Sequence, residues 1–249
     1  MSLEGKIAVV TGGCGGLGQS IASKLIAQGA VVVITDLDDT RGNAVAEELG
    51  CRFFKADVSQ ADDWAALVDM LNADYQGLDI LVNNAAILRA DNIEDETLEN
   101  FNRVMSVNCN SVFIGTQACL PLMKGRDASI VNISSSSSLM GFPQFCAYTA
   151  SKSAVRSLTM STAVHCKQQG YKVRCNSVHP DGIFTPMVMD IPGTPVQLPQ
   201  DKAMLAASFG SPPDAIADVV LFLASDASRQ INGAAISADN TSTIYPPYL

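Results

Sequence analysis

The feature that most constrains the fold of this chain is a regular alternation of short β-branched runs with stretches of helical period. Between the runs, residues 18–28 and 62–75 repeat large apolar side chains at helical spacing. Strands that alternate with helices form βαβ units. We therefore predict an α/β fold of Rossmann type, with a doubly wound parallel sheet of about seven strands. The predicted strands are residues 7–11, 31–35, 51–55, 80–83, 129–133, 173–178 and 234–237.

The predicted strands are apolar at nearly every position, which is typical of a sheet that helices cover on both faces. We expect one domain over residues 1–249. Residues 185–210 break the alternation because they are rich in proline and methionine and contain no clear strand. Since long excursions from a compact domain are often functional, we expect this segment to be a lid over the substrate.

The composition excludes several classes of protein. Hydrophobic residues make up 47% of the chain and charged residues 16%, so there is ample material for a core. A net charge of -9 disfavours binding to nucleic acids, anionic membranes and acidic carrier proteins. The seven cysteines are scattered and form no CxxC pair, which argues against a disulfide framework or a metal site. With no signal peptide and no membrane-spanning run, we expect a cytoplasmic protein.

A glycine-rich loop, TGGCGGLG at residues 11–18, directly follows the first predicted strand and precedes a helix. Glycines let a backbone turn tightly and approach a diphosphate, and a helix N-terminus presents free N–H groups to it. The order of strand, loop and helix therefore predicts a dinucleotide-binding site.

The second predicted strand is followed by Asp36, about 20 residues beyond the loop, where an acid accepts hydrogen bonds from the adenosine ribose. A 2′-phosphate at this place would meet a negative charge. The loop contains no Arg or Lys, and Leu37, Asp38 and Asp39 come next. These residues predict NAD(H), rather than NADP(H), as the cofactor.

Tyr148 and Lys152 are four residues apart in a segment of helical period, so their side chains share one face. A free tyrosine has a pKa near 10, and a nearby ammonium favours the phenolate. Lowering the pKa by 2–3 units takes roughly 3–4 kcal/mol, which we expect Lys152 and a cationic nicotinamide to supply. Because such a pair also occurs on exposed helices, the interpretation depends on the motifs around it.

These motifs together resemble those of the short-chain dehydrogenase/reductase family over essentially the full chain. The matching features are the loop at 11–18, Asp57 with Val58, Asn83-Asn84-Ala85, Asn108, Ser135, and Tyr148 with Lys152.

The resemblance implies a role for each matching residue. Tyr148 would be the acid/base, and Lys152 would lower the tyrosine pKa and bind the nicotinamide ribose. Ser135, thirteen residues before Tyr148, would hold the substrate oxygen, although the other serines of 134–138 are alternatives. Asn108 would hold a water in the proton relay, unless it only caps the helix interior. The resemblance also implies a homotetramer.

The resemblance extends to the cofactor contacts. Asp57 would contact the adenine, and Pro180, Ile183 and Thr185 would lie beside the nicotinamide carboxamide. The full set of implied contacts is Gly12, Cys14, Gly16, Leu17, Gly18, Asp36, Asp57, Val58, Asn83, Tyr148, Lys152, Pro180, Ile183 and Thr185. Two departures from the family pattern, Ala86 for a glycine and Asp181 after Pro180, put the local backbone geometry in question.

Within the family, HPDGIFTPM at 179–187 and SADN at 237–240 look like the bacterial 3β/17β-hydroxysteroid dehydrogenases. That likeness suggests a bulky, apolar secondary alcohol or ketone as substrate. We interpret His165 and His179 as structural. The apolar candidates for the substrate pocket are Leu88, Leu139, Met140, Phe142, Phe145, Met187, Met189, Leu198, Met204 and Leu205.

Two alternatives stay open. A polyol or sugar dehydrogenase would want more Asn, Gln and His in the lid than residues 185–210 contain. A non-catalytic NAD-sensing protein would not need Ser135, Tyr148 and Lys152 together.

Overall fold

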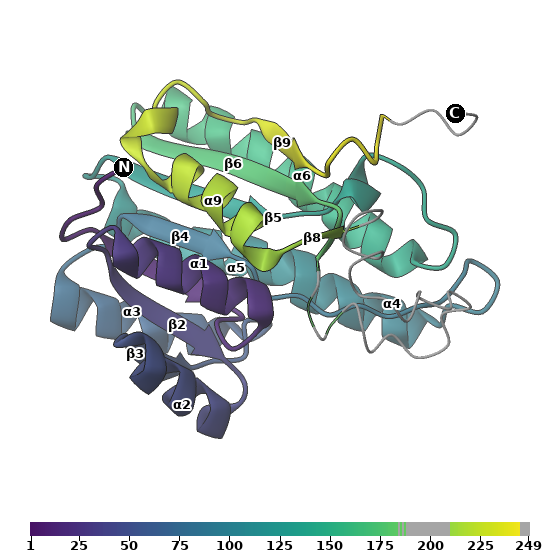
Figure 1. The fold of residues 1–249 in the computed structure, drawn as a ribbon, viewed down its shortest axis with the longest axis horizontal. Helices are drawn as coiled ribbons and strands as arrows, with labels where there is room; N and C mark the ends of the chain where they lie inside the picture. Colours follow the sequence, from purple (N-terminus) through teal and green to yellow (C-terminus); the bar gives the residue numbers. More distant parts are fainter. Residues whose placement is uncertain (184, 186, 188–209, 245–249) are drawn as a thin grey trace.

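A single sheet of seven parallel strands forms the centre of the molecule, in the order β3-β2-β1-β4-β5-β6-β9 (Figure 1). The computed structural model describes residues 1–183, 185, 187 and 210–244. The predicted Rossmann-type fold is confirmed. The strands are β1 (Ile7–Thr11), β2 (Val31–Asp36), β3 (Arg52–Lys55), β4 (Ile80–Asn83), β5 (Ala128–Ile133), β6 (Val173–Pro180) and β9 (Ala235–Ala238).

Helices cover both faces of the sheet (Figure 1). One face packs against α1 (Gly16–Ala27), α2 (Asp39–Leu49) and α9 (Pro213–Ala224). The other packs against α3 (Ala61–Tyr75), α5 (Ser111–Met123) and α6 (Cys146–Gln168). Successive side chains of a strand point to opposite faces. In β1, Val10 therefore belongs to the first core and Val9 to the second, which explains the unbroken apolar runs.

The strand order reverses between β1 and β4. From β1 the chain first adds β2 and β3 on one side, and it then adds β4, β5, β6 and β9 on the other. In open α/β sheets, ligands bind at such a point, outside the carboxyl ends of the strands. The glycine loop and the serine segment 134–138 both leave the sheet at these carboxyl ends.

A π-helical turn, η1 (Ser106–Asn110), joins α4 (Leu98–Met105) to α5 without a break. It contains Asn108, one of the predicted site residues. Single π-helical turns inside longer helices often occur at functional sites. Two short 3₁₀ helices, η2 (Ser136–Ser138) and η3 (Asp226–Ser228), complete the described helices.

A second, two-stranded parallel sheet pairs β7 (Gly182–Ile183) with β8 (Gly210–Ser211). The two ends of the predicted lid therefore lie side by side, just beyond β6. Most of that lid, residues 186 and 188–209, lies outside the described residues. So do four of the predicted pocket residues, Met189, Leu198, Met204 and Leu205.

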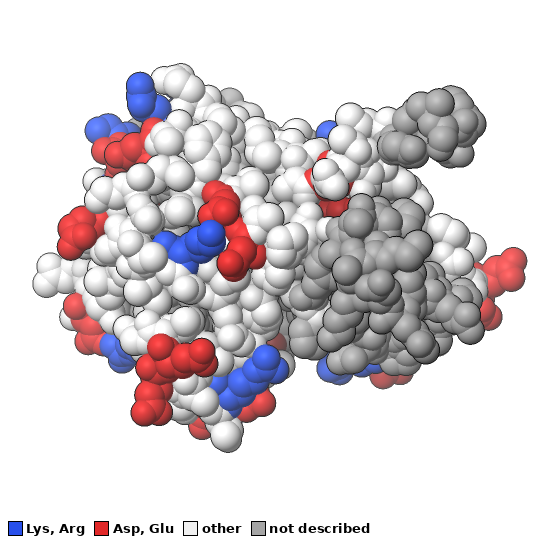
Figure 2. Space-filling model, in the orientation of Figure 1, with Lys and Arg blue, Asp and Glu red and all other residues white. Residues whose placement is uncertain are grey.

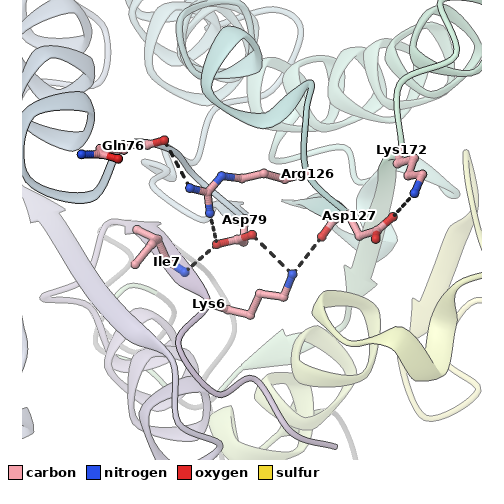
Figure 3. A network of polar contacts seen from close by, with 7 residues as sticks. All are labelled: Lys6, Ile7, Gln76, Asp79, Arg126, Asp127 and Lys172. Carbon is pink, nitrogen blue, oxygen red and sulfur yellow. Dashed lines mark hydrogen bonds and ion pairs between the residues drawn. The ribbon is translucent and has the colours of Figure 1, made fainter.

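The opposite end of the sheet is held by the buried carboxylate of Asp79 (Figure 3). One carboxylate oxygen accepts hydrogen bonds from Ile7 N at 2.9 Å and Arg126 Nη1 at 3.0 Å. The other accepts from Lys6 Nζ at 3.3 Å. One side chain thus joins the starts of β1 and β4 to the connection between α5 and β5.

Acidic and basic side chains are interspersed over the face that carries α1, α2 and α9 (Figure 2). Lys24 of α1, for example, pairs with Asp218 of α9 at 2.6 Å. Among the helices that the structure describes, none is both long and apolar enough to cross a membrane.

Candidate active site

The glycine loop folds back on itself and against the end of β4. Gly12 has a φ of +64°, and a Cβ on it would lie 2.9 Å from Ala85 Cα. A Cβ on Gly18 would overlap the carbonyl of Gly12. Positive φ and close approach both require glycine. The loop is therefore compact enough for its backbone to lie directly against a bound group.

Hydrogen bonds fix the loop to the segment after β4. Thr11 Oγ1 accepts from the N–H groups of Asn84 and Ala85, both at 3.0 Å. Asn84 Nδ2 donates to Thr11 O at 2.8 Å. Helix α1 then begins at Gly16 without a side-chain cap, so the unpaired N–H groups of its first turn are left for a ligand. These features fit the diphosphate of a dinucleotide.

A cleft of about 720 Å³ runs from this loop across the carboxyl ends of the strands. Its lining includes all but two of the predicted catalytic and cofactor-binding residues, the exceptions being Asn83 and Asn108. Of the predicted pocket residues that the structure describes, it includes Met187 alone. The predicted residues in the lining are Gly12, Cys14, Gly16, Leu17, Gly18, Asp36, Asp57, Val58, Ser135, Tyr148, Lys152, Pro180, Ile183 and Thr185.

Asp36 lies at the adenosine end of the cleft. Its carboxylate accepts from Cys14 N at 3.0 Å and from Leu37 N at 2.8 Å. Arg41, in the first turns of α2, lines the same part of the cleft. Arg41 was not among the predicted site residues. A helix that begins at Asp39 would have indicated it, because the first turn of that helix brings position 41 back toward the loop.

The structure places the side chain of Asn83 away from the cleft. Its Nδ2 donates to Asn132 Oδ1 at 2.8 Å, and Asn132 Nδ2 in turn donates to Thr159 Oγ1 at 2.9 Å. This buried chain ties β4 and β5 to α6. The predicted cofactor contact of Asn83 is therefore not seen for its side chain; its neighbour Asn84 lines the cleft instead.

Asn108 is fully buried in η1 and braces the wall of the cleft. Its Oδ1 accepts from Ile87 N at 2.8 Å, and its Nδ2 donates to Ile87 O at 2.9 Å. Nδ2 also lies 3.2 Å from Ser151 Oγ on α6. The side chain of Asn108 is therefore occupied by Ile87 and Ser151, and its role in a proton relay stays a prediction.

The five serines at 134–138 divide by their contacts. Ser134 Oγ donates to Lys152 O, and Ser138 Oγ donates to Ser135 O. Ser136 and Ser137 are buried in η2. Ser135 lines the cleft together with Tyr148, and its hydroxyl acts to lower the pKa of that tyrosine. This geometry favours Ser135 among the alternatives.

Helix α6 presents Tyr148 and Lys152 to the same end of the cleft. Lys152 is 2% exposed, and its Nζ donates to Ile133 O at 2.9 Å. The same Nζ lies 5.6 Å from the centre of the Tyr148 ring. The carbonyl at the end of β5 thus fixes the ammonium beside the phenol.

Burial dominates the ionisation of both groups. It raises the pKa of Tyr148 to about 12, and the polar side chain of Ser135 opposes that rise. Burial lowers the pKa of Lys152 to about 8. The pair of Tyr148 and Lys152 predicts a lowered tyrosine pKa, but the protein groups by themselves raise it, because desolvation outweighs the opposing effect of Ser135.

The lowered pKa of Lys152 predicts a pH-dependent stability difference between the wild-type protein and Lys152→Met. Below pH 8, burying the charged lysine costs the folded state about 3 kcal/mol. Between pH 8 and 10.5 the unfolded chain binds a proton that the folded protein lacks, so stability rises with pH. Denaturant unfolding without nucleotide should show Lys152→Met more stable at pH 7, with the difference shrinking toward pH 10.5. A difference that does not vary with pH would contradict the assigned cause.

A parallel sheet with a glycine loop and a cleft that ends at a serine, a tyrosine and a lysine defines a nucleotide-dependent oxidoreductase. Residues 12–241 match a family described as enoyl-(acyl carrier protein) reductase. The chain belongs to the short-chain dehydrogenase/reductase family. It is an oxidoreductase of the alcohol dehydrogenase kind, and cofactors of this family are nicotinamide nucleotides.

Two relatives and one solved structure illustrate the similarity. The chain is 41% identical to a 3-beta-hydroxysteroid dehydrogenase of Comamonas testosteroni, over 96% of each chain. It is 39% identical to an NADP-dependent (R)-specific alcohol dehydrogenase of Lentilactobacillus kefiri, over 95% of this chain and 96% of that one. The solved structure of an aldohexose dehydrogenase of Thermoplasma acidophilum is 28% identical, with a TM-score of 0.88, covering 99% of this chain and 97% of that one.

Proposed function

We propose that the protein interconverts a hydrophobic secondary alcohol and its ketone with NAD(H), using Ser135, Tyr148, Lys152 and Asn108. The observation that carries the proposal is the convergence of Ser135, Tyr148 and Lys152 at one end of the cleft that starts at the glycine loop. The substrate oxygen would lie between the hydroxyls of Ser135 and Tyr148.

The side chains supply the proton chemistry, and a nicotinamide ring bound in the cleft would supply or accept the hydride. In reduction, the Tyr148 hydroxyl donates its proton to the carbonyl oxygen, while Ser135 orients that oxygen. The ammonium of Lys152 then stabilises the phenolate that remains. In oxidation the phenolate removes the hydroxyl proton. A water on the backbone carbonyl of Asn108 would return protons to solvent.

Apolar side chains beside these residues support a hydrophobic substrate. Met187 lines the cleft and is 44% exposed. Leu139 and Met140, which directly follow the serine segment, are 36% and 39% exposed. Exposed apolar side chains next to a polar site are typical of a surface that binds an apolar ligand. The name of the hydroxysteroid dehydrogenase relative agrees with such a substrate.

The preference for NAD(H) rests on Asp36, since an NADP-dependent relative shows that overall similarity does not decide it. In the cleft, the Asp36 carboxylate would repel a 2′-phosphate, whereas Arg41 would attract one. Asp36 is the more buried of the two and is fixed by two backbone N–H groups. We therefore expect the repulsion by Asp36 to outweigh the attraction by Arg41, which favours NAD(H).

Asp36→Asn should raise the ratio of kcat/KM for NADPH to that for NADH by about 10–100-fold, because a like charge is removed while Arg41 stays. Asparagine can still accept from Cys14 N, so the loop should keep its shape. Asp39→Asn, just outside the cleft, is the matched control and should leave the ratio unchanged. A native enzyme that prefers NADPH, or an unchanged ratio in Asp36→Asn, would overturn the assignment.

The substrate class is tested with a panel of steroidal, cyclic and aryl ketones assayed with NADH, alongside aldohexoses and polyols with NAD. The sugar alternative stays relevant because the solved structure is that of an aldohexose dehydrogenase. The proposal expects the highest kcat/KM with bulky apolar ketones. Higher kcat/KM values for sugars or polyols would instead indicate a polyol or sugar dehydrogenase. Tight NADH binding without turnover of any substrate would favour the NAD-sensing hypothesis.

We also propose that the enzyme is a homotetramer. Phe113 of α5 and Met160 and Val164 of α6 leave large apolar side chains exposed on neighbouring helices. Such side chains would be covered in an assembly of several copies. Light scattering coupled to gel filtration measures the mass directly, and a mass of 26.2 kDa would reject the proposal.

A further inference from the structure

A fully buried histidine, His179 on β6, contacts the serine segment on the side away from the cleft. Its Nδ1 lies 2.7 Å from Ser138 Oγ and 3.2 Å from Ser135 O. Its Nε2 lies 2.8 Å from Ser177 Oγ. The imidazole thus contacts the backbone of the serine that we place at the substrate, although it does not itself line the cleft.

The shorter hydrogen bonds around His179 favour one arrangement of protons, in which Ser177 Oγ turns to the ring at 2.8 Å rather than to Ala234 O at 3.4 Å. Ser138 Oγ donates its only proton to Ser135 O at 2.7 Å, so towards His179 it must act as acceptor. Nδ1 therefore carries the proton and donates to Ser138 Oγ. Nε2 is then the acceptor, and Ser177 Oγ donates to it. The assigned tautomer follows from the network.

The environment keeps the ring neutral. Burial lowers the pKa of His179 to about 4, and the positive charges of Arg156 and Lys152, both on α6, act in the same direction. Asp239, just after β9, and the hydrogen bond to Ser135 oppose them. At the pH values at which the enzyme would be assayed, the single Nδ1–H tautomer is therefore the form present.

We propose that His179 is a positioning residue, which fixes the carbonyl of Ser135 and thereby aims the Ser135 hydroxyl at Tyr148. The proposal rests on the proposed function of Ser135. The carbonyl also accepts from Ser138 N at 3.0 Å, but that bond is internal to the turn. Among the described residues, His179 supplies the one side-chain contact that reaches this carbonyl from another strand. His179 therefore fixes the position of the turn at residues 135–138 relative to β6.

Three substitutions at position 179 separate this role from simple core packing. The amide nitrogen of asparagine can occupy the place of Nδ1, whereas that of glutamine extends to the place of Nε2. His179→Leu should lower kcat about 10–100-fold, because small misplacements of a substrate-holding group cost that much. The Kd for NADH, from fluorescence titration, should change less than twofold. His179→Asn should recover most of kcat, and His179→Gln should not.

Non-additivity gives a second readout. Once Ser135→Ala has removed the hydroxyl, adding His179→Leu should lower kcat no further. Ser138→Ala, which breaks the link from Nδ1 to the carbonyl and leaves the ring in place, should lower kcat a few-fold with an unchanged Tm.

The outcomes distinguish the two proposals. If Ser135→Ala keeps its full kcat, the role assigned to Ser135 fails. If Ser135→Ala loses kcat while the His179 and Ser138 variants keep theirs, only the positioning role fails. An additive double variant, or an asparagine variant as impaired as the leucine one, would also reject that role and leave His179 as a packing residue.

Discussion

Tyr148→Phe is expected to lower kcat by about three orders of magnitude, in both directions of the reaction. General acid–base catalysis by a positioned side chain typically contributes 10²–10⁴-fold. Phenylalanine keeps the ring, which lies beside Lys152, and removes the hydroxyl that would donate the proton. The cleft keeps its shape, so the Kd for NADH should change less than twofold.

The measurement is single-turnover reduction of the best ketone from the panel, combined with a fluorescence titration of NADH. Tyr171→Phe is the matched control, because Tyr171 lies beyond the far end of α6 and packs against His165 and Lys124. It should turn over at the wild-type rate. Near-normal turnover by Tyr148→Phe would show that the tyrosine is not the acid/base. A loss of turnover accompanied by a loss of NADH affinity would indicate a misfolded cleft.

Much of the fold could be predicted from the sequence because strands buried on both faces have an unmistakable apolar signature. The predicted strands differ from the observed ones only at their ends. Strand β6 continues to Pro180, two residues beyond the prediction, because Pro180 lies opposite Ala238 of β9. Strand β2 includes Asp36, opposite Lys55 of β3. Such ends depend on the neighbouring strand, which the local sequence does not contain.

The site residues could be predicted as a set, but the direction of individual side chains could not. Asn83 and Asn84 are adjacent and chemically identical, yet one joins a buried network and the other lines the cleft. Adjacent residues at a strand end point to opposite sides, and only the register of the sheet decides which is which. Ala86, one of the two departures from the family pattern, has a negative φ, so its backbone does not need glycine.

The pKa of Tyr148 shows a different limit. Spacing predicts that Tyr148 and Lys152 share a face, and the structure places them together. How deeply that face is buried depends on β5, η2 and the cleft wall, which spacing cannot report. Desolvation, a property of the whole fold, therefore decides the sign of the shift. If Tyr148 acts as proposed, we expect the charge of a bound nicotinamide to lower its pKa.

Asp79→Ala should destabilise the protein strongly while leaving its chemistry intact. The substitution strands the buried N–H of Ile7 and removes the acid that Lys6 and Arg126 share (Figure 3). A buried donor without a partner costs about 1–3 kcal/mol. Lys6 and Arg126 are both about one-third exposed and can turn to water. The loss of their ion pairs therefore destabilises the protein less than the loss of a fully buried pair would. We expect a total of about 2–4 kcal/mol, or a Tm lower by roughly 5–15 °C.

Asp127→Ala provides the matched control at the same end of the sheet. The Asp127 carboxylate is 3.7 Å from Lys172 Nζ, and both side chains are largely exposed. An exposed pair of this kind contributes about 0–1 kcal/mol. The bond from Lys6 to Asp127 is made to the backbone carbonyl, which alanine retains. Thermal and denaturant unfolding should therefore show Asp79→Ala to be clearly less stable than Asp127→Ala. The kcat at 25 °C should stay at the wild-type value in both variants, because the cleft lies at the opposite ends of the strands. Equal stabilities would show that the Asp79 network is dispensable, and a lower kcat in Asp79→Ala would show that the two ends of the sheet are coupled.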